Sequence, residues 1–137
     1  MKKILFALIA LFSLASCTQN NGHIGDIFGL WKVESIEIDG EIEEEYQGNL
    51  FFAFQNDVVG MCERAPYDDS DWRYGQYFKT GDKAIDMYFD MNGQAPLKIS
   101  HFQLGLNACK ILELNSSRFV FSTVIYEREY KYSMKKW

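Results

Sequence analysis

The chain beyond residue 25 is divided into short apolar segments by turn-forming residues, and this division constrains its fold more than any other feature. In the segment Lys83–Met91, Ile85, Met87 and Phe89 fall on one face of an extended chain, and the residues between them fall on the other. No stretch repeats its apolar residues with the period of 3.6 that an amphipathic helix needs. The sequence therefore predicts a domain built almost entirely of β-strands.

Turn signals such as Asp39-Gly40, Asn56-Asp57 and Asn92-Gly93 bound the expected strands. The strands are expected at Leu30–Ile38, Asn49–Gln55, Val58–Arg64, Trp72–Lys79, Lys83–Met91, Leu97–Leu106, Cys109–Leu114, Arg118–Ile125 and Tyr126–Lys136. The alternation changes phase within Leu97–Leu106, as a β-bulge would produce. Short connections between these nine segments favour an up-and-down antiparallel barrel, for which we expect eight strands, with a β-sandwich as the alternative.

The first residues predict export and a lipid anchor. Lys2 and Lys3 precede an apolar run, Ile4–Leu14, that is too short to span a bilayer as a mature anchor. The Leu-Ala-Ser-Cys that ends at Cys17 resembles the lipobox of bacterial lipoproteins, in which the cysteine is acylated and becomes the first mature residue. An ordinary secretory signal with a chance cysteine is the alternative.

This reading divides the chain into a signal peptide over 1–16, a flexible tether over 17–25 and a barrel domain over 26–137. Lipoprotein processing typically supplies more than one acyl chain, which makes a stable membrane anchor at Cys17. Thr18 follows the cysteine where an aspartate would retain a lipoprotein in the inner membrane, so we expect the outer membrane. The absence of an acidic stretch after Cys17 favours the periplasmic side over the cell surface.

Size and charge exclude some partners. Removal of residues 1–16 leaves 121 residues, enough for one domain with a core of its own. Those residues include 12 basic and 19 acidic side chains, a formal net charge of −7. A nucleic-acid partner is not expected, because phosphate binding requires a basic stripe that the sequence lacks.

Two cysteines, Cys62 and Cys109, remain in the mature chain, and both would lie in a compartment that permits disulfides. A bond between them and two buried free thiols are both compatible with the sequence. Cofactor and metal sites are not expected, since His23 and His101 are the only histidines and no Cys/His cluster is present. The acidic residues Asp68, Asp69 and Asp71 read as a solvated loop, with calcium binding as the alternative.

The start of the domain, Gly29-Leu30-Trp31, resembles the Gly-x-Trp signature of lipocalins and lipocalin-like proteins. In that family the glycine follows a short 3₁₀ turn, which Asp26-Ile27-Phe28 could form here, and the tryptophan packs across the closed end of the barrel. The segment KILELNSSRFVFSTVIYEREYKYSMKKW also resembles the closing hairpins of small lipocalin-like lipoproteins of Bacteroidetes. The resemblance implies a barrel that binds a small molecule without catalysis.

The candidate ligand-binding residues are the side chains expected to face the barrel lumen: Trp31, Phe52, Phe54, Ile85, Met87, Phe89, Phe121, Tyr130 and Tyr132. Aromatic and methionine side chains suit an apolar or amphipathic guest. An eight-stranded barrel can instead be filled by its own side chains. In that case the protein would act through its outer surface, as an accessory subunit of an envelope protein complex.

Catalysis has little support in the sequence. His101 is the one histidine within an expected strand, and a structural role for it is favoured over a His–carboxylate dyad. No nucleophile motif or paired-carboxylate arrangement that would support hydrolysis is present.

Overall fold

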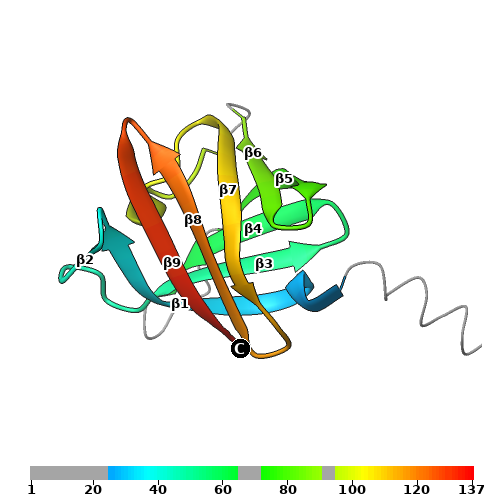
Figure 1. Ribbon diagram of the computed structural model, residues 1–137, viewed down its shortest axis with the longest axis horizontal. Coiled ribbons are helices and arrows are strands. Elements are labelled where there is room, and N and C mark those ends of the chain that lie inside the picture. Colours follow the sequence, from blue (N-terminus) through cyan, green and yellow to red (C-terminus); the bar gives the residue numbers. More distant parts are fainter. Residues whose placement is uncertain (1–24, 65–71, 91–94) are drawn as a thin grey trace, which may run out of the picture.

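A computed structural model describes residues 25–64, 72–90 and 95–137. Within these ranges the chain forms strands and two short 3₁₀ helices (Figure 1). The elements are η1 (Gly25–Ile27), β1 (Gly29–Ile38), β2 (Glu41–Ile42), β3 (Leu50–Gln55), β4 (Val58–Glu63), β5 (Trp72–Gly81), β6 (Ala84–Phe89), η2 (Lys98–Ser100), β7 (Gly105–Leu114), β8 (Arg118–Ile125) and β9 (Arg128–Lys136).

The sheet is a closed antiparallel barrel. Strands β3 to β9 pair with their neighbours in chain order, and β1 pairs with both β3 and β9. Eight strands therefore complete the barrel, and β2 is an additional short strand on the second half of β1. The all-β, up-and-down barrel expected from the sequence is confirmed. The β-sandwich alternative is wrong, because the β1–β9 pairing joins the two edges that a sandwich would leave open.

The inner face of the barrel carries a continuous apolar core, as strand alternation predicts. Strand β3 departs from alternation because it is buried on both faces. Phe52 and Phe54 point inward, whereas Phe51 lies on the outer face under Trp137 and Arg64, at 5.2 and 4.9 Å from its ring centroid. The non-alternating apolar run at this strand thus has a local cause: another segment covers its outer side.

The expected strand Leu97–Leu106 is wrong. The segment forms η2 and a loop, and β7 begins only at Gly105. His101 has a positive φ angle of 63°, which is not an extended strand conformation, and Gly105, where β7 begins, has a positive φ angle of 93°. The change of phase in the sequence therefore marks a turn of the chain rather than a bulge. A smaller difference is β2 (Glu41–Ile42), which forms between two expected strands, where the sequence predicted none.

The Gly-Leu-Trp segment closes one end of the barrel. Trp31 is fully buried and its Nε1 donates a hydrogen bond to the carbonyl of Ile27 in η1, at 2.8 Å. The ammonium of Lys136 lies 4.4 Å from the centroid of the Trp31 ring and donates to the carbonyl of Phe28. The φ angle of Gly29 is 123°, a conformation that other residues rarely adopt, and a Cβ there would also displace the Lys136 ammonium, 2.8 Å away, so the position favours glycine. The 3₁₀ turn and the tryptophan expected at this end are confirmed.

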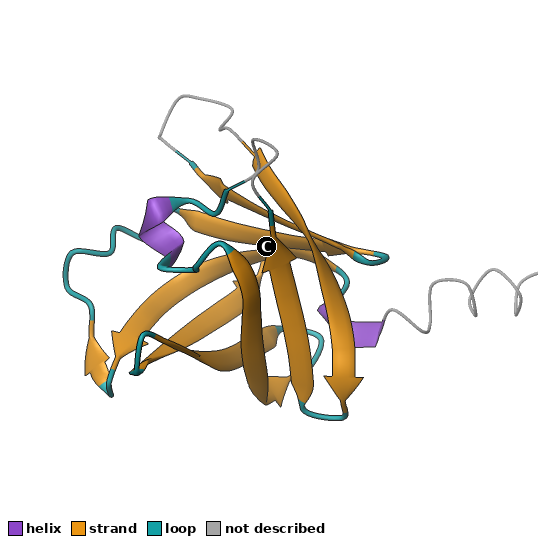
Figure 2. Cartoon of the chain, turned by 90° about the horizontal axis from the view of Figure 1, so that it is seen from above, coloured by secondary structure: helices purple, strands orange, loops and turns teal. Residues whose placement is uncertain are grey.

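The two 3₁₀ helices lie at opposite ends of the barrel in both views (Figures 1 and 2). We call the two ends the η1 end and the η2 end. Among the described residues, none belongs to a helix long and apolar enough to cross a membrane.

Candidate functional site

The centre of the barrel is filled by the side chains that the sequence proposed as ligand contacts. Eight of the nine candidates are almost completely buried: Trp31, Phe52, Phe54, Ile85, Met87, Phe89, Phe121 and Tyr132. Their rings pack edge to face and in stacks, with Phe121 and Tyr132 stacked at a centroid distance of 4.8 Å. Tyr130 is the exception, since it is only partly buried and packs on the edge of this core. Whether any of the nine contacts a ligand stays a prediction.

Phe102 completes this packing from outside the strands. The β6–β7 segment inserts its ring among Phe52, Phe89, Phe121 and Tyr132, at centroid distances of 5.6, 6.0, 6.2 and 5.5 Å respectively. The ring is 8% exposed. Phe102 therefore acts as a plug that closes the η2 end of the barrel.

The segment that carries the plug is held by buried polar groups. The hydroxyl of Tyr132 donates to the carbonyl of Ser100, and Ser100 Oγ accepts a hydrogen bond from the backbone N–H of Phe102 at 3.1 Å. The Asn107 side chain accepts from the N–H of Gln103 at 3.0 Å and donates to the carbonyl of the same residue at 2.9 Å. Burial raises the pKa of the Tyr132 phenol, so this hydroxyl stays a donor. Each bond also satisfies a group that would be costly to bury alone.

His101 links the plug segment to the loop before β3. Its Nε2 lies 2.9 Å from both carboxylate oxygens of Glu43, and its ring stacks on Tyr130 at a centroid distance of 5.1 Å. A His–carboxylate pair does exist here, but both partners are engaged in joining two loops. This placement supports the structural role expected for His101 and explains why Tyr130 lies outside the filled core.

An apolar hollow lies at the η1 end. It has a volume of about 560 Å³. Its floor is formed by the apolar and aromatic side chains Ile27, Tyr77, Ile85, Ile111 and Leu114, and its rim by Gly25, Asp26, Asn56, Asp57 and Lys79. We call this hollow the η1 pocket. The sequence candidates missed most of it, because only Ile85 was among the residues expected to face the lumen.

The pocket is apolar inside and charged at its mouth. Burial raises the pKa of the Tyr77 phenol, and the nearby carboxylate of Asp57 raises it further. The N–H of Tyr77 also donates to the carbonyl of Asp57, at 2.9 Å. An apolar floor with a few polar groups at the rim is the usual composition of a site for a small amphipathic molecule.

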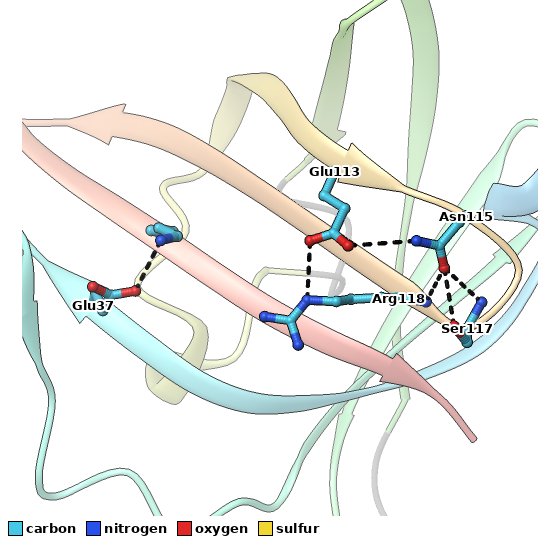
Figure 3. Close-up of polar contacts among 6 residues, drawn as sticks. Glu37, Glu113, Asn115, Ser117 and Arg118 are labelled. Atoms are coloured by element: carbon cyan, nitrogen blue, oxygen red, sulfur yellow. Dashed lines mark hydrogen bonds and ion pairs between the residues drawn. The ribbon is translucent and has the colours of Figure 1, made fainter.

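The β7–β8 turn fixes one wall of the pocket, next to Leu114. The side-chain oxygen of Asn115 accepts hydrogen bonds from the N–H groups of Ser117 and Arg118, at 3.0 and 2.8 Å (Figure 3). Glu113 and Arg118 form an ion pair of 3.1 Å across the same turn. An Asn side chain that accepts hydrogen bonds from two backbone N–H groups of a turn restricts the backbone there.

The outer face of the barrel carries a second cluster of aromatic residues. Trp137, 59% exposed, packs on Phe51, and Trp72 stacks on Tyr74 at a centroid distance of 6.1 Å. A groove of about 650 Å³ lies beside Phe51. It is lined by Gln47, Gly48, Asn49, Phe51, Glu63, Arg64 and Trp137.

The structure has both Cys62 and Cys109 as free, buried thiols. Cys109 belongs to the inner core, whereas Cys62 follows the inward-facing Met61 and so lies on the outer face of β4. A disulfide would have to cross the barrel wall, so the structure favours the free-thiol alternative. Burial raises the pKa of both thiols, that of Cys109 to about 12.

No group of three or more His, Cys, Asp or Glu side chains that could hold a metal ion occurs among the described residues. The acidic residues considered for calcium, Asp68, Asp69 and Asp71, lie outside the described ranges.

Two solved structures share this architecture. A lipocalin-like protein from Bacteroides uniformis superposes with a TM-score of 0.64 and 17% identity, over 82% of this chain and 100% of that chain. An uncharacterized protein from Bacteroides eggerthii gives a TM-score of 0.59 and 18% identity, over 80% of this chain and 98% of that chain. No protein-family model and no curated protein sequence matches the chain. At these identities the likeness concerns the fold, and on that ground the domain is a lipocalin-like β-barrel of the kind found in Bacteroides proteins.

Proposed function

We propose that the protein is a lipid-anchored envelope lipoprotein that binds a small apolar or amphipathic molecule without catalysis. The observation that carries the proposal is the η1 pocket, with its apolar floor and its charged rim. Its volume of about 560 Å³ falls in the range of sites that bury most of a small ligand. Lipocalin-like folds are also suited to binding small molecules.

The η1 pocket is a better candidate site than the centre of the barrel. The central side chains already contact one another and the Phe102 plug, so a ligand there would have to displace packed rings. Ile85, Ile111 and Leu114 instead line space that is already open. We therefore place the ligand against these residues.

The anchor and location follow from the first residues. Acylation of Cys17 would hold the domain on the outer membrane, on its periplasmic side, through the short tether that ends at Gly25. Metabolic labelling with an alkyne-modified palmitate tests the anchor directly. The label should appear on the wild-type chain and be absent from Cys17→Ser.

Binding can be tested with the soluble Cys17→Ser chain and the fluorescent apolar probe N-phenyl-1-naphthylamine. Leu114→Glu places a carboxylate on the half-buried wall of the pocket, and we expect it to weaken probe binding at least tenfold, because an unpaired charge opposes apolar contact. Leu104→Glu is the matched control, since Leu104 is 46% exposed and lies outside the pocket. Equal probe binding by both variants, with circular dichroism showing that both are folded, would refute the site.

A second function is supported by the outer aromatic cluster. Exposed aromatic side chains next to a groove are typical of protein interaction surfaces. In this alternative the barrel is an accessory subunit of an envelope complex, and the contacts involve Trp137 and Arg64. Cross-linking in intact cells tests it: a cross-linked partner should be recovered with the wild-type chain and lost with the pair Trp137→Ala and Arg64→Glu, but retained with Leu114→Glu.

A further inference from the structure

We propose that the groove beside Phe51, on the outer face of the barrel, binds a neutral carbohydrate chain. This groove is separate from the η1 pocket, so the inference goes beyond the proposed function and does not depend on it. It assigns a carbohydrate to a surface for which the second candidate function expects a protein partner. The groove combines an exposed aromatic ring with planar hydrogen-bonding side chains, and this combination suits a sugar.

The first observation is an exposed tryptophan that is held in place. The N–H of Trp137 donates to the carbonyl of Leu30 at 2.9 Å, and the Trp137 ring packs edge to face on Phe51. The ammonium of Lys32 lies 5.4 Å from the centroid of the same ring. Trp137 is nevertheless 59% exposed. The C–H groups on the flat side of a pyranose carry a small positive charge, so the negative face of an aromatic ring attracts them.

The second observation is the polar lining next to this ring. The groove has a volume of about 650 Å³. Two amides, a carboxylate and a guanidinium line it, and they belong to Gln47, Asn49, Glu63 and Arg64. Each of these groups is planar and presents two neighbouring hydrogen-bonding atoms. Each can therefore bond to two adjacent hydroxyl groups of a sugar.

Three of these polar side chains are ordered by contacts within the protein. Asn49 Nδ2 donates to Glu63 Oε1 at 3.1 Å, and the guanidinium of Arg64 lies 4.9 Å from the centroid of the Phe51 ring. The N–H of Arg64 also donates to the carbonyl of Asn49 at 2.9 Å, which holds these two residues opposite each other where β3 begins and β4 ends. Side chains that are already ordered lose less conformational entropy when a ligand binds.

The charges and the lining favour a neutral sugar over a polyanion or a protein. Arg64 and Glu63 place one cation and one anion on the groove, and the chain after residue 16 has a net charge of −7, which opposes a polyanionic ligand. Among the described residues that line the groove, only Phe51 and Trp137 are apolar, and Phe51 is 4% exposed. The centre of a protein interface is instead typically apolar and depleted in glutamate.

Two further aromatic rings favour a chain of several sugar units over a single one. Phe51 pairs with Cys62 and Cys62 pairs with Trp72, so Trp72 lies two strands from Phe51 on the outer face. Trp72 stacks on Tyr74, which is 50% exposed. A Cβ at Gly60 would lie 3.1 Å from both rings, so the glycine lets them lie close to the sheet. Neighbouring strands are about 5 Å apart, so the two aromatic positions are about 10 Å apart, a distance that an oligosaccharide can span.

The test begins with the soluble Cys17→Ser chain on an array of neutral oligosaccharides from β-glucans, α-glucans, xylans and mannans. The oligosaccharide that gives the strongest signal is then titrated by isothermal calorimetry. We expect Trp137→Ala to weaken its binding about tenfold or more, because the substitution removes the stacking surface. Phe78→Ala is the matched control and should bind like the wild type, since Phe78 is 48% exposed on β5 but does not line the groove.

Further variants separate stacking and hydrogen bonding from a loss of folding. Trp137→Phe keeps an aromatic face and should bind more tightly than Trp137→Leu, which keeps only an apolar one. Asn49→Ala should weaken binding several-fold, because it removes hydrogen bonds to the sugar. Circular dichroism shows whether each variant is folded. Equal binding by folded Trp137→Phe and Trp137→Leu would contradict the stacking.

The inference is overturned if no neutral oligosaccharide on the array binds, or if the one that binds is bound equally well by Trp137→Ala. A cross-linked protein partner that depends on Trp137 and Arg64, with no oligosaccharide bound, would make the groove a protein interface instead.

The groove and the η1 pocket fail separately. Leu114→Glu should leave oligosaccharide binding unchanged, and Trp137→Ala should leave binding of N-phenyl-1-naphthylamine unchanged. Oligosaccharide binding that is lost in Leu114→Glu but kept in Trp137→Ala would place the sugar in the η1 pocket and overturn the inference. Loss of probe binding in the η1 pocket alone would contradict the proposed function and leave the groove as a carbohydrate site.

Discussion

Replacement of Phe102 by alanine tests the claim that a loop residue completes the barrel core. Phe102 is 8% exposed and contacts four buried rings, although it belongs to no strand. Truncation of a buried phenylalanine to alanine typically costs about 3–5 kcal/mol. The lower end of this range applies here, because the β6–β7 segment lies at the end of the barrel and can move to fill part of the cavity that the truncation leaves. We expect Phe102→Ala to lower the free energy of unfolding by about 3 kcal/mol.

The assay is equilibrium unfolding in urea of the soluble Cys17→Ser chain, followed by tryptophan fluorescence. For a domain of this size, 3 kcal/mol corresponds to a fall of about 10–15 °C in melting temperature. Phe78→Ala is the matched control: Phe78 is 48% exposed on β5, and exposed substitutions usually change stability by about 0.5 kcal/mol or less.

A cost for Phe102→Ala no greater than that for Phe78→Ala would refute the reasoning, because the ring would then contribute nothing to the core. The same variant also separates the two ends of the barrel. Its affinity for N-phenyl-1-naphthylamine in the η1 pocket should stay within about twofold of wild type, since Phe102 does not line that pocket.

Three further predictions follow from buried polar groups. Tyr132→Phe removes the hydrogen bond to the carbonyl of Ser100 and should cost about 1–3 kcal/mol in urea unfolding, whereas no measurable cost would mean that the bond is not formed. Burial raises the pKa of Tyr46 to about 12, so the folded state binds this proton more tightly than the unfolded state. The contribution of the Tyr46 phenol to the free energy of unfolding is therefore fully present below pH 10 and is lost as the pH rises to about 12. Across this range the melting temperature should fall less steeply with pH for Tyr46→Phe than for the wild type. Cys62 and Cys109 should react with Ellman's reagent in denaturant but not in the folded Cys17→Ser chain, and a disulfide-bonded mass would contradict the structure.

The fold could be predicted from the sequence because its signals are local. Alternation at Ile85, Met87 and Phe89 fixes which face of β6 is buried, and turn residues such as Asp39-Gly40 fix where strands end. The closed end could be predicted from Gly29 and Trp31 for the same reason. Trp31 bonds to Ile27, only four residues before it, and Gly29 lies between the two.

The candidate site was harder to predict, because residues far apart in the sequence form it and come together only when the barrel closes. Phe102 looked like a strand residue, and nothing near it in sequence indicates that His101 turns the chain with a positive φ angle. The floor of the η1 pocket combines Ile111 with Tyr77, and an apolar residue near one end of a barrel has the same pattern in the sequence as one at its packed centre. Alternation in the sequence shows whether a side chain points into or out of the barrel, but not where it lies along the barrel axis.

The pairing of β1 with β9 has a consequence for how the protein is made. Lys136 bonds to the carbonyl of Phe28 across 108 residues, so the barrel cannot close until nearly the whole chain is available. Contacts so distant in sequence form late and slowly. A nascent chain therefore lacks the partner strand that would lock its first strand in place until the last strand of the barrel has been synthesised.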